Sequence, residues 1–174
     1  MSGILIEPLA RAEIGRLARI HAQCFDEPWS ADMVRRVLDT AGAFGLAARR
    51  GARSTLAGFA LGRVVVDECE LLSLGVAPES RGRGLGTALL DEAMARAAGL
   101  GVHRFFLEVG EFNHTARRLY DSRGLVPVGR RRGYYELRGG GTMDALTMRC
   151  EFARPGRSDP VPGGHPLAAD ALRT

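Results

Sequence analysis

The chain has 174 residues, of which 45% are hydrophobic and 25% are charged, and its formal net charge is +4. This length suits one domain with a hydrophobic core, and the composition is that of a globular protein rather than a disordered or membrane protein. No apolar stretch is long enough to cross a bilayer, and the first residues lack the pattern of a secretory signal, so we expect a cytoplasmic protein.

The basic charge comes entirely from arginine, and its densest cluster is Arg130 to Arg132, with Arg117 and Arg118 as further basic residues. Such a cluster is typical either of a solvated face or of an RNA contact. We favour the solvated face and expect no direct nucleic-acid binding. The cysteines show no metal-ligand spacing, so we expect small buried side chains and no metal site. They are Cys24, Cys69 and Cys150.

In chain order, the first part of the sequence predicts a strand, two helices and three further strands. The strand covers 4–6, the helices cover 10–24 and 31–40, and the later strands cover 43–49, 55–66 and 70–76. Short connections between the later strands indicate an antiparallel meander. His21 lies on the apolar face of the first helix, which favours a hydrogen-bonded core histidine over a catalytic one. Ser30 is the expected N-cap of the second helix, and Trp29 before it could pin the two helices together or shape a substrate groove.

The second part of the sequence predicts two helices and three strands. The helices cover 85–99 and 114–121, and the strands cover 104–109, 125–128 and 145–149. Because a helix joins the strands at 70–76 and 104–109, we expect these two strands to be parallel in one sheet. Gly75 marks an expected bulge whose unpaired N–H groups could bind a carbonyl. Residues 129–144 are predicted to be a long binding loop, and the Pro/Gly-rich residues from 153 onwards are predicted to be disordered.

A glycine-rich turn joins the strand that ends at Val76 to the helix that follows. Gly82, Gly84 and Gly86 let the backbone turn and let another group approach closely, while the first N–H groups of the helix point at one spot. Such a turn is an anion site, most naturally for phosphate, although an ordinary strand-to-helix turn remains open on these residues alone. A Walker A loop needs Gly-Lys-Ser/Thr, and the dinucleotide fingerprint needs a glycine where Thr87 stands, so neither fits.

The remaining pattern, Arg81-x-x-Gly84-x-Gly86, resembles the acyl-CoA pyrophosphate loop of the GNAT family of N-acetyltransferases. The order of the predicted elements is also the GNAT order, so the resemblance covers about residues 3 to 150. It further rests on Phe-Asp-Glu-Pro-Trp-Ser at 25–30, Leu-Gly-Val-Ala-Pro at 74–78, Leu-Glu-Val at 107–109 with Leu119 and Tyr120, and Arg-Gly-Tyr-Tyr at 132–135. The resemblance implies an α/β GNAT fold with a mixed, mostly antiparallel central sheet flanked by helices, in a domain over 1–152 with a disordered tail over 153–174.

The resemblance also implies direct acetyl transfer from acetyl-CoA, with Glu108 as general base and Tyr120 as general acid. The implied acetyl-CoA contacts are Leu74, Gly75, Val76, Arg81, Gly82, Arg83, Gly84, Leu85, Gly86, Thr87 and Asn113, of which Asn113 helps to hold the pantetheine arm. The implied substrate contacts are Trp29, Tyr134 and Tyr135. The segment Gly110-Glu111-Phe112 departs from the more usual Arg-x-Ser, which leaves substrate recognition open at that point.

The chemistry of the residues fits these two roles. Glu108 follows apolar residues in a strand, where a carboxylate needs either an arginine partner or a catalytic task because its desolvation is costly. Tyr120 lies on the inward face of its helix, where its hydroxyl needs a hydrogen bond. Acetyl transfer to an amine requires a proton acceptor, a polarised carbonyl and a proton for the departing thiolate. Glu108 could accept the proton of the amine. The strand N–H groups over 74–76 could polarise the carbonyl, and Tyr120 could protonate the thiolate.

Within the family, the motifs are most similar to those of the RimI group of ribosomal-protein-alanine N-acetyltransferases. We therefore expect acetylation of a protein N-terminal α-amine, with a ribosomal protein as partner and a monomeric or weakly dimeric enzyme. Acetylation of a small-molecule amine or of lysine is the alternative within the family. A non-catalytic acyl-CoA-binding module and an RNA-contacting ribosome factor represent other functional classes. The presence of both Glu108 and Tyr120 argues against the non-catalytic module.

Overall fold

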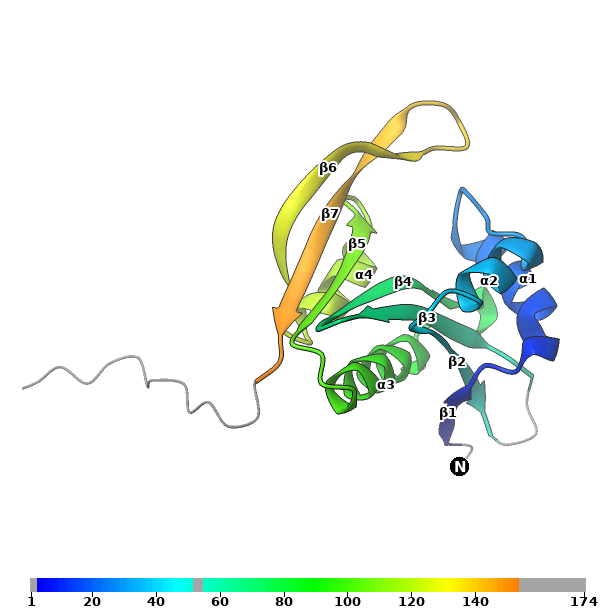
Figure 1. Ribbon diagram of the computed structural model, residues 1–174. Helices are drawn as coiled ribbons and strands as arrows, with labels where there is room; N and C mark the ends of the chain where they lie inside the picture. The colour runs from blue at the N-terminus through cyan, green and yellow to red at the C-terminus, as the bar shows by residue number, and fades with distance from the viewer. Residues whose placement is uncertain (1–2, 52–54, 154–174) are drawn as a thin grey trace, which may run out of the picture.

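The computed structural model describes residues 3–51 and 55–153, which form a seven-stranded sheet in the order β1-β2-β3-β4-β5-β7-β6 with helices on both faces (Figure 1). The strands are β1 (Ile4–Pro8), β2 (Ala43–Arg50), β3 (Gly58–Val65), β4 (Glu68–Val76), β5 (Arg104–Gly110), β6 (Val126–Glu136) and β7 (Thr142–Glu151). The helices are α1 (Ile14–Cys24), α2 (Ala31–Leu38), α3 (Leu85–Gly99) and α4 (His114–Asp121), with short 3-10 helices η1 (Arg11–Glu13) and η2 (Pro78–Ser80). This is the mixed α/β fold expected from the sequence.

Strands β4 and β5 are parallel for only part of their length. β1 to β4 form the expected antiparallel meander, and β7 pairs antiparallel with both β5 and β6. The parallel pairing begins with Glu68 opposite Arg104 and ends with Leu71 opposite Leu107. Beyond that pair β4 continues along β3 while β5 continues along β7, so the two strands diverge toward their C-terminal ends (Figure 1).

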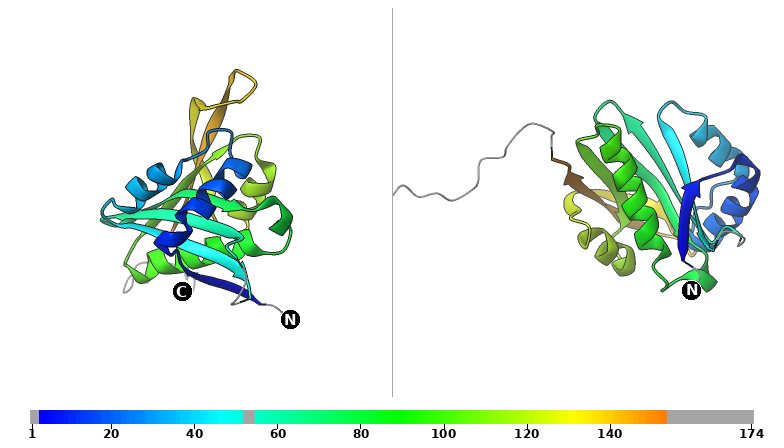
Figure 2. Two further views of the ribbon diagram at one scale, coloured as in Figure 1. Left: turned by 90° about the vertical axis from the view of Figure 1, so that its right-hand side faces the viewer. Right: turned by 90° about the horizontal axis from the view of Figure 1, so that it is seen from below.

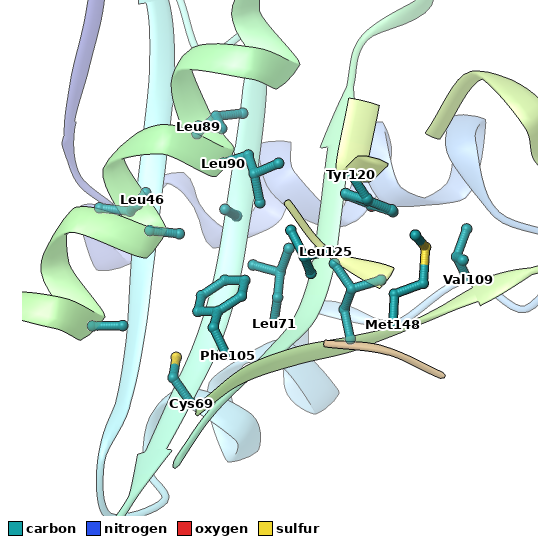
Figure 3. Close-up of a cluster of buried hydrophobic side chains, with 14 of the residues drawn as sticks. Leu46, Cys69, Leu71, Leu89, Leu90, Phe105, Val109, Tyr120, Leu125 and Met148 are labelled. Atoms are coloured by element: carbon teal, nitrogen blue, oxygen red, sulfur yellow. The ribbon is translucent and has the colours of Figure 1, made fainter. Parts of the chain in front are cut away.

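A hydrophobic core lies on each face of the sheet, and Figure 2 shows the strands between two helical layers. α1 and α2 cover one face, where Leu17 packs in one cluster with Phe59. α3 and α4 cover the other face, where Leu89, Phe105 and Tyr120 share a second cluster (Figure 3). Because side chains alternate along a strand, the residues of β5 between the core positions of this second cluster point toward the α1/α2 face.

The bulge predicted at Gly75 lies elsewhere in β4. Gly75 pairs regularly with Phe59, and the register shifts instead where Leu72 is left without a partner opposite β3. A Cβ on Gly75 would lie 2.7 Å from the Phe59 ring, so the glycine makes room for an aromatic side chain and not for a bulge. The backbone groups that the bulge was expected to free are released by the divergence of β4 from β5.

The binding loop predicted over 129–144 is a β-hairpin whose connection is only 137–141. β6 runs to Glu136 and β7 begins at Thr142. Nearly every residue of β6 is exposed, so its sequence lacks the apolar alternation that marks a half-buried strand. The register shifts between Arg131 and Tyr135, and Gly133 has a φ of +58° there. The tail predicted to be disordered lies, from residue 154, outside the described residues.

Candidate active site

The glycine-rich turn forms the N-terminus of α3 with its backbone N–H groups uncovered. Gly82 and Gly84 have φ of +70° and +83°, a region that favours glycine. Gly84 is the N-cap of α3, no side chain caps that end, and its first turn contains no acidic residue. A Cβ on Gly82 would meet nothing within 4 Å. The turn therefore offers the geometry of an anion site, with Arg81 and Arg83 exposed beside it.

The Arg81 side chain turns back toward the end of β4. Its Nε donates to the Val76 carbonyl at 3.1 Å, and one Nη lies 3.5 Å from the Cys24 Sγ. The guanidinium therefore supports the shape of the turn, and the backbone of the turn is left to face an anion.

Glu108 lies at the residue where β5 leaves β4, directly after the last pair at Leu107. Its side chain is 16% exposed and accepts a 2.8 Å hydrogen bond from Arg131 on β6. The guanidinium of Arg131 also lies 4.1 Å from the centre of the Tyr134 ring. The arginine partner considered for Glu108 thus exists in the structure, and it comes from the hairpin that the sequence predicted to be a loop.

Tyr120 of α4 is 7% exposed, and burial raises its pKa to about 12, so its hydroxyl keeps its proton. It packs on the α3/α4 face, whereas the side-chain alternation of β5 places Glu108 on the opposite face. The Tyr135 hydroxyl donates to the Glu108 carbonyl at 3.4 Å. The structure therefore joins Glu108 to the β6–β7 hairpin through Tyr135 and Arg131, while Tyr120 belongs to the core on the other face of the sheet.

His21 has the structural role expected from the sequence, and Asn113 has a structural role at the start of α4. Asn113 caps α4, because its Oδ1 accepts from the Ala116 N–H at 3.1 Å. His21 is 2% exposed, and its Nδ1 accepts from the Trp29 N–H at 3.1 Å. Burial lowers the pKa of His21 to about 4, so the imidazole is neutral. The Trp29 ring stacks on His21 with 5.1 Å between ring centres, which is the arrangement expected of a residue that pins the two helices together.

A set of contacts without a local sequence signal joins the β6–β7 hairpin to the end of α1 and the connection between α1 and α2 (Figure 1). The Arg138 guanidinium donates to the carbonyls of Ala22 at 3.3 Å and Phe25 at 3.2 Å. Glu27 accepts from the Glu136 N–H at 2.7 Å. These partners are more than a hundred residues apart in the chain, so no local pattern links them. The hairpin and the α1–α2 connection together form an arch on the side of the sheet that carries Glu108.

The segment that departs from the usual family pattern lies at the end of β5. A Cβ on Gly110 would lie 2.5 Å from the Met143 Cε, the end of a flexible side chain that can move aside, so packing alone does not require glycine there. Glu111 pairs with Arg130 at 3.2 Å, and Phe112 is 68% exposed. Arg130 and Arg131 of the basic cluster are thus both engaged by carboxylates of the chain.

The family model of the acetyltransferase (GNAT) family matches residues 14–125. The chain belongs to the GNAT family. It is 39% identical over 158 residues to the N-alpha-acetyltransferase RimI of Mycobacterium tuberculosis, covering 87% of this chain and 95% of that protein. The crystal structure of the ribosomal-protein-S18-alanine N-acetyltransferase from Escherichia coli has a TM-score of 0.79 with 26% identity and covers 90% of this chain and 100% of that one.

The fold is shared with Arabidopsis thaliana NAA60 in complex with acetyl-CoA, at a TM-score of 0.74 and 24% identity, covering 86% of this chain and 98% of that one. This chain is therefore an N-acetyltransferase of the GNAT family, and enzymes of this family use acetyl-CoA. Among the described residues, no group of His, Cys, Asp and Glu could hold a metal ion. No helix in the described ranges is long and apolar enough to span a membrane.

Proposed function

We propose that this enzyme acetylates the N-terminal α-amine of a protein, with acetyl-CoA as the acetyl donor. The observation that carries the proposal is the position of the mostly buried carboxylate of Glu108 where β5 leaves β4. We infer that the hydroxyl of Tyr120 approaches the same place from the other face of the sheet. An amine and a thioester that meet where the two strands diverge would lie between a carboxylate and a phenol.

The N-terminus of α3 supplies the binding site for the pyrophosphate of acetyl-CoA. The backbone N–H groups from Leu85 to Thr87 begin a helix with no side-chain cap, and the open space at Gly82 admits an anion. The edge of β4 over 74–76, no longer paired with β5, supplies N–H groups for the acetyl carbonyl. The Nδ2 of Asn113 is left for the pantetheine arm because capping uses only its Oδ1.

Acetyl-CoA supplies the acetyl group as a reactive thioester, and two side chains of the enzyme accept and donate the protons. Glu108, directly or through a water molecule, accepts the proton of the amine, and Tyr120 donates one to the departing sulfur. Arg131 must release Glu108 for the first step. Its side chain is 56% exposed, so this ion pair opens at little cost.

Two features favour a protein N-terminus over lysine. An α-amine with a pKa of about 7.7 to 8.0 is roughly a fifth to a third neutral near pH 7.4, whereas a lysine amine near 10.4 is neutral in only about one molecule in a thousand. A single carboxylate such as Glu108 is a weak base and suits the α-amine. The arch closed by Arg138 also favours a chain end, which can enter endwise, over an internal side chain.

The names of the relatives point to the substrate. The M. tuberculosis relative is named an N-alpha-acetyltransferase, and the E. coli structure is that of a ribosomal-protein-S18-alanine N-acetyltransferase. We therefore propose ribosomal proteins that begin with alanine as substrates. Intact-mass spectrometry of ribosomal proteins tests this. Cells that lack the gene should contain a ribosomal protein without its acetyl group, whereas unchanged masses for all ribosomal proteins would contradict the ribosomal substrate.

A further inference from the structure

A small cavity lies on the sheet near the proposed base. It has a volume of about 170 Å³ and is lined by Arg63, Val65, Glu68, Glu70 and Phe106. In the sheet register Arg63 pairs with Glu70, and Glu70 pairs with Phe106. Side-chain alternation places all these residues on the face that carries Glu108.

Arg63 and Glu70 oppose each other in this cavity and attract each other electrostatically, and Glu70 is also attracted by Arg131. The Nε of Arg63 is buried and has no hydrogen-bond partner among the described residues, and Glu70 forms no hydrogen bond or ion pair within 4 Å with a described residue. Glu68, by contrast, pairs with Arg104 at 3.1 Å. A partly buried guanidinium beside a partly buried carboxylate can bind a ligand group that both accepts and donates hydrogen bonds.

The distance between Phe106 and Glu108 along β5 relates the cavity to the proposed position of the reacting amine. Phe106 is two residues before Glu108 on β5, a distance of about 6.6 Å along a strand. An extended peptide covers the same distance in two residues. If the α-amine of an acceptor peptide lies at Glu108 and the peptide runs back along β5 toward Phe106, its third residue reaches the cavity.

We propose that this cavity is a specificity subsite for the third residue of the acceptor chain, and that it takes a side chain with an apolar stem and a hydroxyl or amide end, such as tyrosine or glutamine. The proposal rests on the proposed function, because it requires a peptide amine at Glu108. Phe106 and Val65 provide the apolar wall, while Arg63 donates to the polar end and Glu70 accepts from it. A lysine or glutamate side chain would be attracted by one of these charges and repelled by the other.

The test is the kcat/KM for peptides that begin with alanine and vary only at the third residue. Tyrosine should be preferred over phenylalanine by about tenfold, because a hydrogen bond to a charged group contributes about 1.5 kcal/mol or more. The preference should fall to near one in Arg63→Met and in Glu70→Gln. It should persist in Arg149→Gln, because Arg149 flanks Phe106 in the register but does not line the cavity.

The outcomes separate this subsite from the proposed function. If the wild-type enzyme acetylates the α-amines of these peptides but treats tyrosine and phenylalanine alike, the subsite is wrong and the function stands. A preference that appears instead when the second or fourth residue is varied would also overturn it. If no peptide α-amine is acetylated while another amine is, the proposed function itself fails.

Discussion

At the scale of single residues, Glu108 shows how a proposed catalytic group can also be a structural partner. The carboxylate is hydrogen-bonded to Arg131, and that arginine stacks on Tyr134. Arg130, its neighbour on β6, pairs with Asp144 and Glu111 instead. The two arginines therefore make a matched pair for experiment, because only one of them contacts the proposed base.

We expect the loss of the base and the loss of the acid to depend differently on pH. Glu108→Gln should lower kcat/KM at neutral pH and recover partly in alkaline buffer, where the amine is already neutral, whereas Tyr120→Phe should remain impaired throughout. Losses of about 100-fold are typical of such groups. Initial rates across pH measure this, with Arg130→Gln as the control variant. Wild-type turnover in both variants would show that the assignments are wrong.

His21 should make stability depend on pH. Its pKa falls from 6.5 in the unfolded chain to about 4 in the folded protein. The unfolded state therefore binds the proton more readily, and the stability that neutral His21 contributes is complete above pH 6.5 and is lost as pH falls toward 4. The loss could reach about 3 kcal/mol.

Urea unfolding at several pH values measures this effect in the wild type and in His21→Gln, whose amide oxygen can still accept from Trp29. The variant should show a flatter profile between pH 4 and 6.5. Parallel profiles for the two proteins would exclude His21 as the source.

At the scale of elements, the N-terminus of α3 can be tested with two glycines that have similar backbones. Gly84 has φ of +83° at the proposed phosphate site, and Gly101 has φ of +79° just past the other end of the helix. A Cβ on Gly101 would meet nothing within 4 Å, and one on Gly84 would meet only Ile4 at 3.4 Å. Alanine should therefore strain both positions to a similar degree.

We expect Gly84→Ala to weaken acetyl-CoA binding by about tenfold or more, because distorting the turn removes hydrogen bonds to a charged phosphate. Gly101→Ala should leave the affinity unchanged. Calorimetric titration of both folded variants with acetyl-CoA gives the comparison. Equal affinities would exclude the turn as the phosphate site.

The hairpin contact gives a second prediction at this scale. Arg138→Ala should raise the KM for peptide by several-fold, because the arch loses hydrogen bonds to three carbonyls between residues 22 and 26, while the affinity for acetyl-CoA should not change. Arg132→Ala, also an exposed arginine of the hairpin, is the control. An unchanged KM for peptide in Arg138→Ala would mean that the arch does not shape the peptide site.

At the scale of the whole molecule, the sequence predicted the order of the elements because most of them have a buried face. β5 alternates buried and partly exposed residues, and α3 buries Leu85, Leu89 and Ala93 at helical spacing. Only the base of the hairpin, over 125–128 and 145–149, was predicted as strands. Residues 129–144 were predicted as a loop because β6 is exposed along nearly its whole length and carries no such pattern. The Arg131–Glu108 and Arg138 contacts were missed because each depends on that hairpin folding back over the sheet.

The central claim is that this GNAT enzyme acetylates a protein N-terminus. The most direct measurement is a competition within one peptide that begins with alanine and also contains an internal lysine, incubated with the enzyme and acetyl-CoA and read by fragment mass spectrometry. We expect nearly all of the acetyl groups on the α-amine. Predominant acetylation of the lysine, or faster turnover on a small-molecule amine than on any peptide, would contradict the claim and leave only the acetyl-CoA chemistry of the family.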